Sequence, residues 1–169
     1  ALKLDINFIQ YNHQQNYSSL PKNSLLVKNF YVAKKVIAGK LDLKNSAYVI
    51  SMIENATQTC LNRDFRGMIT GPVHKNIINQ SGINFRGHTE FIAEMCESKS
   101  VMAFVSDNMK MALATTHIPL KKVPNSIDSR LLIETIEIIE KDLKTYFGLK
   151  KPIIGVLGLN PHAGEQGLL

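Results

Sequence analysis

The sequence predicts a layered α/β fold with a mixed β-sheet, because helical and strand-like patterns alternate along the chain. Apolar residues recur at helical spacing in residues 24–38, 46–61 and 129–147. Short apolar runs typical of strands occupy residues 2–9, 65–70, 101–105, 109–116 and 153–157. Two brief helices are expected at residues 73–80 and 90–96. In such sheets ligands collect at the carboxyl ends of strands.

The composition indicates a soluble globular protein. The 169 residues suffice for one domain or two small lobes with a sizeable core. The net charge of +6 comes from scattered lysine pairs without interleaved aromatic residues, which favours solubility and attraction for small anions over a nucleic-acid surface. No apolar run approaches the roughly 18 residues that span a bilayer, and no signal-peptide pattern opens the sequence. We expect a cytoplasmic protein that binds neither nucleic acid nor membrane.

One stretch predicts a binding site. The apolar run 65–70 ends in Thr-Gly-Pro, and Pro72 suits the first turn of a helix. A glycine-bracketed loop then presents His88 and Thr89 at the start of the next helix, where backbone N–H groups and the helix dipole favour an anion. These two residues are candidates to bind a substrate carboxylate or phosphate. The alternative is a helix N-cap beside an ordinary histidine.

Two further histidines follow apolar runs. His117 comes after residues 109–116, and His162 comes after residues 153–157. Two neutral imidazoles at strand ends can ligate a divalent metal, each oriented by a second polar partner. Asn160 and Glu165 flank His162 and are candidates for that partner. The alternative is a pair of loop histidines that hydrogen-bond to the backbone.

Lys75 lies one turn into the helix that follows Thr-Gly-Pro. It could contact an anion or, if desolvated, transfer a proton; a solvated surface lysine is the alternative. The glycines near the C-terminus do not form the G-x-G-x-x-G fingerprint of a dinucleotide-binding fold, and no Walker A sequence occurs.

Residues 101–105 and 109–116 flank Ser-Asp-Asn, which suits a tight turn, and predict an antiparallel hairpin. The hairpin is apolar on both faces, so something must cover it. Either the helix 129–147 of the same chain or the same surface of a two-fold-related partner can do so.

Four motifs occur together and in order: Thr70-Gly71-Pro72-Val73-His74-Lys75, Gly87-His88-Thr89-Glu90, Thr115-Thr116-His117-Ile118-Pro119-Leu120 and Leu159-Asn160-Pro161-His162-Ala163-Gly164-Glu165. With them the chain resembles the 4-hydroxythreonine-4-phosphate dehydrogenase family of vitamin B6 biosynthesis, from about residue 24 to the C-terminus. The resemblance implies an α/β/α fold of the isocitrate and isopropylmalate dehydrogenase type. It also implies a homodimer with active sites shared between subunits.

The implied reaction is NAD- or NADP-dependent oxidation of 4-phosphohydroxy-L-threonine, followed by decarboxylation to 3-amino-2-oxopropyl phosphate. The resemblance makes His117 and His162 ligands of a divalent metal (zinc, magnesium or cobalt). His88 and Thr89 become contacts of the phosphorylated amino-acid substrate. It does not assign a role to Lys75.

Members of this family are about twice as long, so the resemblance implies that residues 1–169 are a partial catalytic domain. The third metal histidine, the residues that grip the phosphate and most of the nucleotide site would then lie elsewhere, and this part alone would be inactive. Two alternatives are a related dehydrogenase acting on another hydroxy-acid phosphate, and a basic binding module without enzymatic activity.

Overall fold

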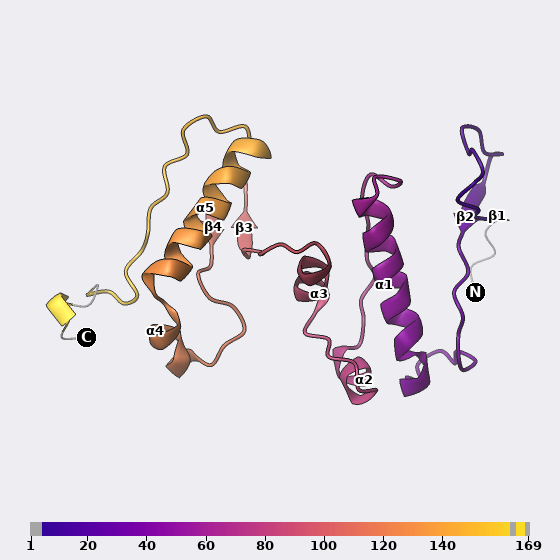
Figure 1. Ribbon diagram of the computed structural model, residues 1–169, viewed down its shortest axis with the longest axis horizontal. Coiled ribbons are helices and arrows are strands. Elements are labelled where there is room, and N and C mark those ends of the chain that lie inside the picture. Colours follow the sequence, from indigo (N-terminus) through magenta and orange to yellow (C-terminus); the bar gives the residue numbers. More distant parts are fainter. Residues whose placement is uncertain (1–4, 163–164, 168–169) are drawn as a thin grey trace. The chain divides into compact units, whose positions relative to one another are not determined.

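The computed structural model describes residues 5–162 and 165–167 and divides the chain into two compact units, Ala1–Ser98 and Lys99–Leu169 (Figure 1). Both units combine helices with a two-stranded sheet, so the predicted mixed α/β class is confirmed. The strands described do not join into one sheet. No helix in residues 5–162 and 165–167 is both long and apolar enough to cross a bilayer.

The first sheet pairs β1 (Asn7–Gln10) in parallel with β2 (Ser24–Val27). The helix predicted at residues 24–38 is therefore wrong: after β2 the chain is irregular up to residue 42. The predicted segment includes Val27, Val32 and Val36, whose branched side chains make them weaker helix formers than alanine or leucine. Its apolar side chains, such as Tyr31 and Val36, are exposed and give no packed face that could stabilise a helix.

Helix α1 (Ser46–Leu61) forms over the predicted residues, directly after the 3₁₀ turn η1 (Leu43–Asn45). Asn45 occupies the N-cap position of α1 without capping it by its side chain. That side chain instead bonds both backbone groups of Lys34, at 2.9 Å from the amide nitrogen and 3.0 Å from the carbonyl oxygen. It thereby ties the irregular segment to the start of α1.

The core of the first unit joins α1 to α2 (Lys75–Gln80) and α3 (His88–Met95). Ile50 and Ile53 of α1 are buried together with Ile78 of α2 and with Phe85, which precedes α3. Burying a side chain of this size contributes about 1.5–3 kcal/mol. The cluster therefore fixes residues 73–92 on the surface of α1.

The loop between α2 and α3 is held by Asn79. Its amide nitrogen donates to the Phe85 carbonyl oxygen and its Oδ1 accepts from the Phe85 amide, both at 2.9 Å. The same nitrogen also lies 3.0 Å from the Lys75 carbonyl oxygen. The turn begins at Gly82, whose φ of 89° suits glycine. The end of the helix predicted at Ser81 and Gly82 is thus confirmed.

The second unit contains the predicted hairpin, in which β3 (Ala103–Val105) pairs antiparallel with β4 (Lys110–Ala112). A hydrogen bond of 3.0 Å from the Leu113 amide to the Met102 carbonyl oxygen extends the ladder. Residues at the base of the hairpin, such as Met102 and Leu113, line a small cavity of about 100 Å³ together with residues of α5. Phe104 and Met109 remain more than half exposed.

Helix α5 (Ser129–Thr145) confirms the predicted amphipathic helix. Asp128 caps it by accepting a hydrogen bond of 2.7 Å from the Leu131 amide. Before it, η2 (Leu120–Lys122) and α4 (Val123–Ser126) lie between the hairpin and α5. The turn η3 (Glu165–Gly167) begins at the last residue of the fourth motif.

Two predicted strands, at residues 65–70 and 153–157, do not form in the part of the chain described. A strand exists only through hydrogen bonds to a neighbouring strand, and neither segment has such a neighbour among the described residues. Ile69 and Ile153 are consequently fully exposed, at 102% and 98%. The strand predicted at residues 2–9 is shortened to β1, and residues 2–4 lie outside the described part.

Replacing Asn79 with Ala should lower the free energy of unfolding by about 1–3 kcal/mol, because the amide and carbonyl of the buried Phe85 lose their partners. Chemical denaturation measures this change. Asn76→Ala, at an exposed position of the same helix, is the matched control and should be nearly neutral. Equal stabilities of the two variants would contradict the role assigned to Asn79.

Glu134 on α5 should make the second unit sensitive to acid. Hydrogen bonds from Lys99 and then from Arg130 lower the pKa of Glu134 below its ordinary value of 4.5. The stabilisation is therefore present above that ordinary pKa and is lost as pH falls through the lowered value. In denaturation midpoints measured across acidic pH, Glu134→Gln should flatten this dependence.

The control for Glu134 is Glu137→Gln, an exposed position on the same helix. Because the Glu134 pairs are accessible to solvent, added salt should also weaken the effect. An unchanged pH profile in Glu134→Gln would show that the pairs do not stabilise the fold.

Candidate functional site

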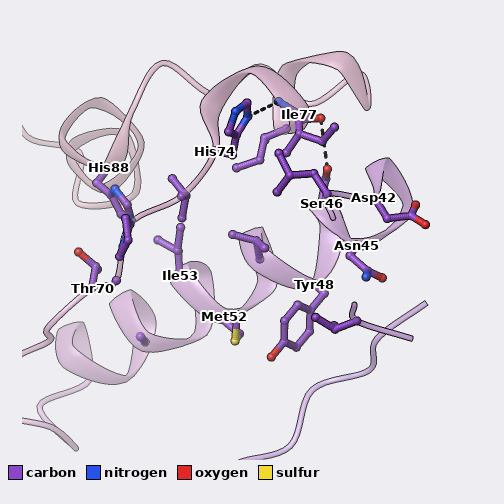
Figure 2. A pocket seen from close by; sticks show the side chains of 18 of the residues that line it. Asp42, Asn45, Ser46, Tyr48, Met52, Ile53, Thr70, His74, Ile77 and His88 are labelled. Atoms are coloured by element: carbon purple, nitrogen blue, oxygen red, sulfur yellow. Dashed lines mark hydrogen bonds between the residues drawn. The ribbon is translucent and has the colours of Figure 1, made fainter. Parts of the chain in front are cut away.

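The first unit contains a cavity of about 520 Å³ between α1 and the segment 68–74 (Figure 2). Its walls are mainly apolar and include Tyr48, Met52 and Ile53 of α1. Polar side chains reach it from three parts of the chain: the start of α1 and the residues before it, the segment 68–74, and the start of α3. They are Lys40, Asp42, Asn45, Ser46, Thr70, His74 and His88. An apolar cavity with a few polar groups is the usual form of a small-molecule site.

His88 is the predicted site residue that lines this cavity. Its ring packs edge-on against Phe85, with centroids 5.8 Å apart and an interplanar angle of 82°. Its Nε2 is buried and has no hydrogen-bond partner among the described residues. A buried polar atom without a partner costs about 1–3 kcal/mol, and a ligand that bonds to it would remove that cost.

Helix α3 begins at His88 because of Gly87. This N-cap residue has φ 157° and ψ 171°, a region nearly restricted to glycine. A Cβ there would lie 2.8 Å from Oε2 of Glu90. Neither His88 nor Thr89 is the N-cap, so that alternative is wrong. Thr89 is exposed in the first turn and does not line the cavity.

His74 is a cavity residue that the sequence prediction did not identify. Its Nδ1 accepts a hydrogen bond of 3.3 Å from the Ile77 amide and so caps α2 (Figure 2). The proton of the neutral ring is therefore on Nε2. A histidine just before a short helix is the only sequence signal of this role. Lys75, the next residue, is exposed and lies outside the cavity lining, as expected of a surface lysine.

The two predicted metal ligands lie in the second unit. His117 is exposed and follows the hairpin with φ 56°, a left-handed conformation that is uncommon outside glycine but enriched in histidine. The His162 amide donates a 2.8 Å hydrogen bond to Oδ1 of Asn160. Nδ1 of His162 lies 2.6 Å from Oε1 of Glu165.

The four predicted site residues are divided between the two units. His88 and Thr89 belong to the first unit, and His117 and His162 to the second. No interaction joins His117 to His162 in the described part of the chain. Within residues 5–162 and 165–167, no three histidine, cysteine, aspartate or glutamate side chains converge as a metal site.

Comparison with known proteins identifies the family. The model of the pyridoxal phosphate biosynthetic protein PdxA matches residues 1–169. A 4-hydroxythreonine-4-phosphate dehydrogenase of Serratia proteamaculans is 45% identical over 168 residues, which are 98% of this chain and 51% of that protein. A protein of the same name from Vibrio cholerae is 39% identical over 169 residues, which are 99% of this chain and 51% of that protein. The chain thus spans about half the length of these curated relatives.

Solved structures agree. A provisionally assigned 4-hydroxythreonine-4-phosphate dehydrogenase from Salmonella typhimurium superposes with a TM-score of 0.81 at 26% identity, over 97% of this chain and 51% of that one. The structure of a 4-hydroxythreonine-4-phosphate dehydrogenase from Klebsiella pneumoniae superposes with a TM-score of 0.77 at 23% identity. The match covers 96% of this chain and 50% of that one. The resemblance carried by the four motifs is confirmed, and the chain belongs to the PdxA family of pyridoxal phosphate biosynthetic proteins.

Proposed function

We propose that the whole protein is an NAD- or NADP-dependent 4-hydroxythreonine-4-phosphate dehydrogenase. It oxidises 4-phosphohydroxy-L-threonine and then releases carbon dioxide to give 3-amino-2-oxopropyl phosphate, for pyridoxal 5'-phosphate synthesis. Family membership supports the substrate class. The observation in the chain itself that carries the proposal is the buried Nε2 of His88, which lies beside an apolar cavity and has no hydrogen-bond partner in residues 5–162 and 165–167.

His88 and Thr89 are the residues of this chain proposed to bind the substrate. The ring of His88 is held by Phe85, so its Nε2 presents a fixed hydrogen-bonding position. Thr89 adds an exposed hydroxyl in the first turn of α3. The positive end of that helix dipole favours a phosphate or carboxylate in the same place. The two residues would orient an anionic substrate without taking part in bond breaking.

His117 and His162 are proposed to hold a divalent cation. Their donor atoms fit one: neutral imidazoles suit zinc or cobalt, whereas magnesium prefers oxygen ligands. The contact at Nδ1 of His162 leaves its Nε2 without a partner in the described residues. When bound, such a cation stabilises negative charge on the substrate oxygen during oxidation and decarboxylation. Catalytic sites commonly use about three protein ligands, so a third would come from outside the described residues.

The layered α/β/α arrangement and a homodimer are part of the proposal. The exposed apolar runs around Ile69 and Ile153 resemble strands that lack neighbours. The half-exposed hairpin residues Phe104 and Met109 offer apolar surface to a two-fold partner. Further strands that complete the sheet would cover the runs around Ile69 and Ile153. Dimerisation would cover Phe104 and Met109. A cytoplasmic location, without membrane or nucleic-acid partners, is consistent with this small-molecule chemistry.

The whole protein should produce NADH or NADPH from 4-phosphohydroxy-L-threonine. His88→Ala should lower kcat/KM by about 10- to 100-fold, the effect of one hydrogen bond to a charged group. The matched control His13→Ala, an exposed histidine of the same unit, should retain activity. Turnover of a four-carbon sugar-acid phosphate without turnover of 4-phosphohydroxy-L-threonine would instead establish the related dehydrogenase.

The metal proposal predicts that His117→Ala and His162→Ala each weaken zinc affinity by at least about 100-fold, more than the loss of an outer partner usually does. Competition with a chromophoric chelator measures the affinity. His13→Ala serves again as the control, because it removes an exposed imidazole elsewhere. Wild-type affinity in both variants would exclude these residues as ligands.

A further inference from the structure

Within the described residues, His162 makes the closest approach between an imidazole and a carboxylate. Its Nδ1 lies 2.6 Å from Oε1 of Glu165, and the two side chains remain 62% and 50% exposed. The other such pair, His13 and Asp64, is separated by 3.7 Å. The carboxylate is therefore within hydrogen-bonding distance of one particular ring nitrogen of His162.

The local backbone brings Glu165 to this position. The Glu165 amide lies 3.3 Å from the His162 carbonyl oxygen and closes a turn. Glu165 and Gln166 have φ angles of 38° and 60°, left-handed values that residues other than glycine seldom adopt. On the other side, the backbone amide of His162 donates a hydrogen bond to Oδ1 of Asn160. The histidine is thus held at its backbone by one neighbour and at its ring by another.

The two nitrogens of a neutral imidazole have opposite roles, because one carries the proton and the other a lone pair. A carboxylate at Nδ1 selects the tautomer with the proton on Nδ1. The lone pair is then on Nε2, pointing away from Glu165. A histidine that binds metal commonly donates its other N–H to a carboxylate in this way.

We propose that Glu165 is a positioning residue for His162: its carboxylate accepts the Nδ1 proton and so reserves the Nε2 lone pair for a divalent cation. This inference rests on the proposed metal-binding role of His162. Glu165 does not contact the cation or the substrate; it fixes the tautomer and the orientation of the ring, and its charge makes Nε2 a stronger donor.

The first test is zinc affinity of the whole protein, measured by chelator competition. Glu165→Ala should weaken binding about 10- to 100-fold, the usual effect of removing such a partner. Glu165→Gln keeps a neutral acceptor and should recover part of the loss. Glu137→Ala, which removes an exposed carboxylate from α5, should leave the affinity unchanged. An equal zinc affinity of the unchanged protein and of Glu165→Ala would overturn the role of Glu165. It would not affect the metal-binding role proposed for His162.

The second test reads the tautomer in the metal-free protein by nitrogen-15 NMR of histidine side chains, at a mildly alkaline pH above the ordinary pKa of an imidazole. His162→Ala assigns the signal. The unchanged protein should carry the proton on Nδ1, and Glu165→Ala should shift the population toward Nε2. A proton on Nε2 in the unchanged protein would overturn the inference. A protein that binds no zinc at all would overturn the proposed metal site and, with it, this function of Glu165.

Discussion

The first unit depends on the burial of Phe85 and Ile78 against α1. Phe85 is nearly inaccessible, yet its backbone lies in a loop, where amide and carbonyl groups normally require water. Asn79 resolves this conflict because its side chain supplies both a donor and an acceptor to that one residue. Without it, burying Phe85 would leave two polar groups unsatisfied. The position of Gly87 and His88, immediately downstream, follows from this arrangement.

The second unit is organised by α5 and by the ion pairs that Glu134 of this helix forms. Asp128 fixes where the helix begins, and Gly148, with φ 68°, follows its last turn. Glu134 binds Lys99, which precedes the hairpin in the chain, so an ion pair connects the helix to the segment that leads into the hairpin. These pairs are accessible to solvent, so they orient the elements more than they stabilise them.

The features that could be predicted from the sequence are those that are local. The helices at residues 46–61 and 129–145 and the hairpin follow from apolar spacing, capping residues and turn chemistry within a few positions. Residues 24–27 instead pair in parallel with β1, a contact that periodicity cannot reveal. The candidate site residues also divide into those that local sequence predicts and those that only the folded chain reveals. The motifs made His88 and His162 candidates, whereas the capping role of His74 rests on a hydrogen bond to a folded backbone.

Hydrogen bonding places the ring proton on opposite nitrogens of two chemically identical side chains. In His74, Nδ1 accepts from the Ile77 amide, so Nε2 carries the proton and can donate to an anion but cannot ligate a metal. In His162, Nδ1 faces the Glu165 carboxylate, which favours the proton there and leaves Nε2 able to bind a cation. Exchanging the two environments would exchange the nitrogens that carry the proton. The residue type supplies only the capacity for either role, and the neighbour at Nδ1 decides between them.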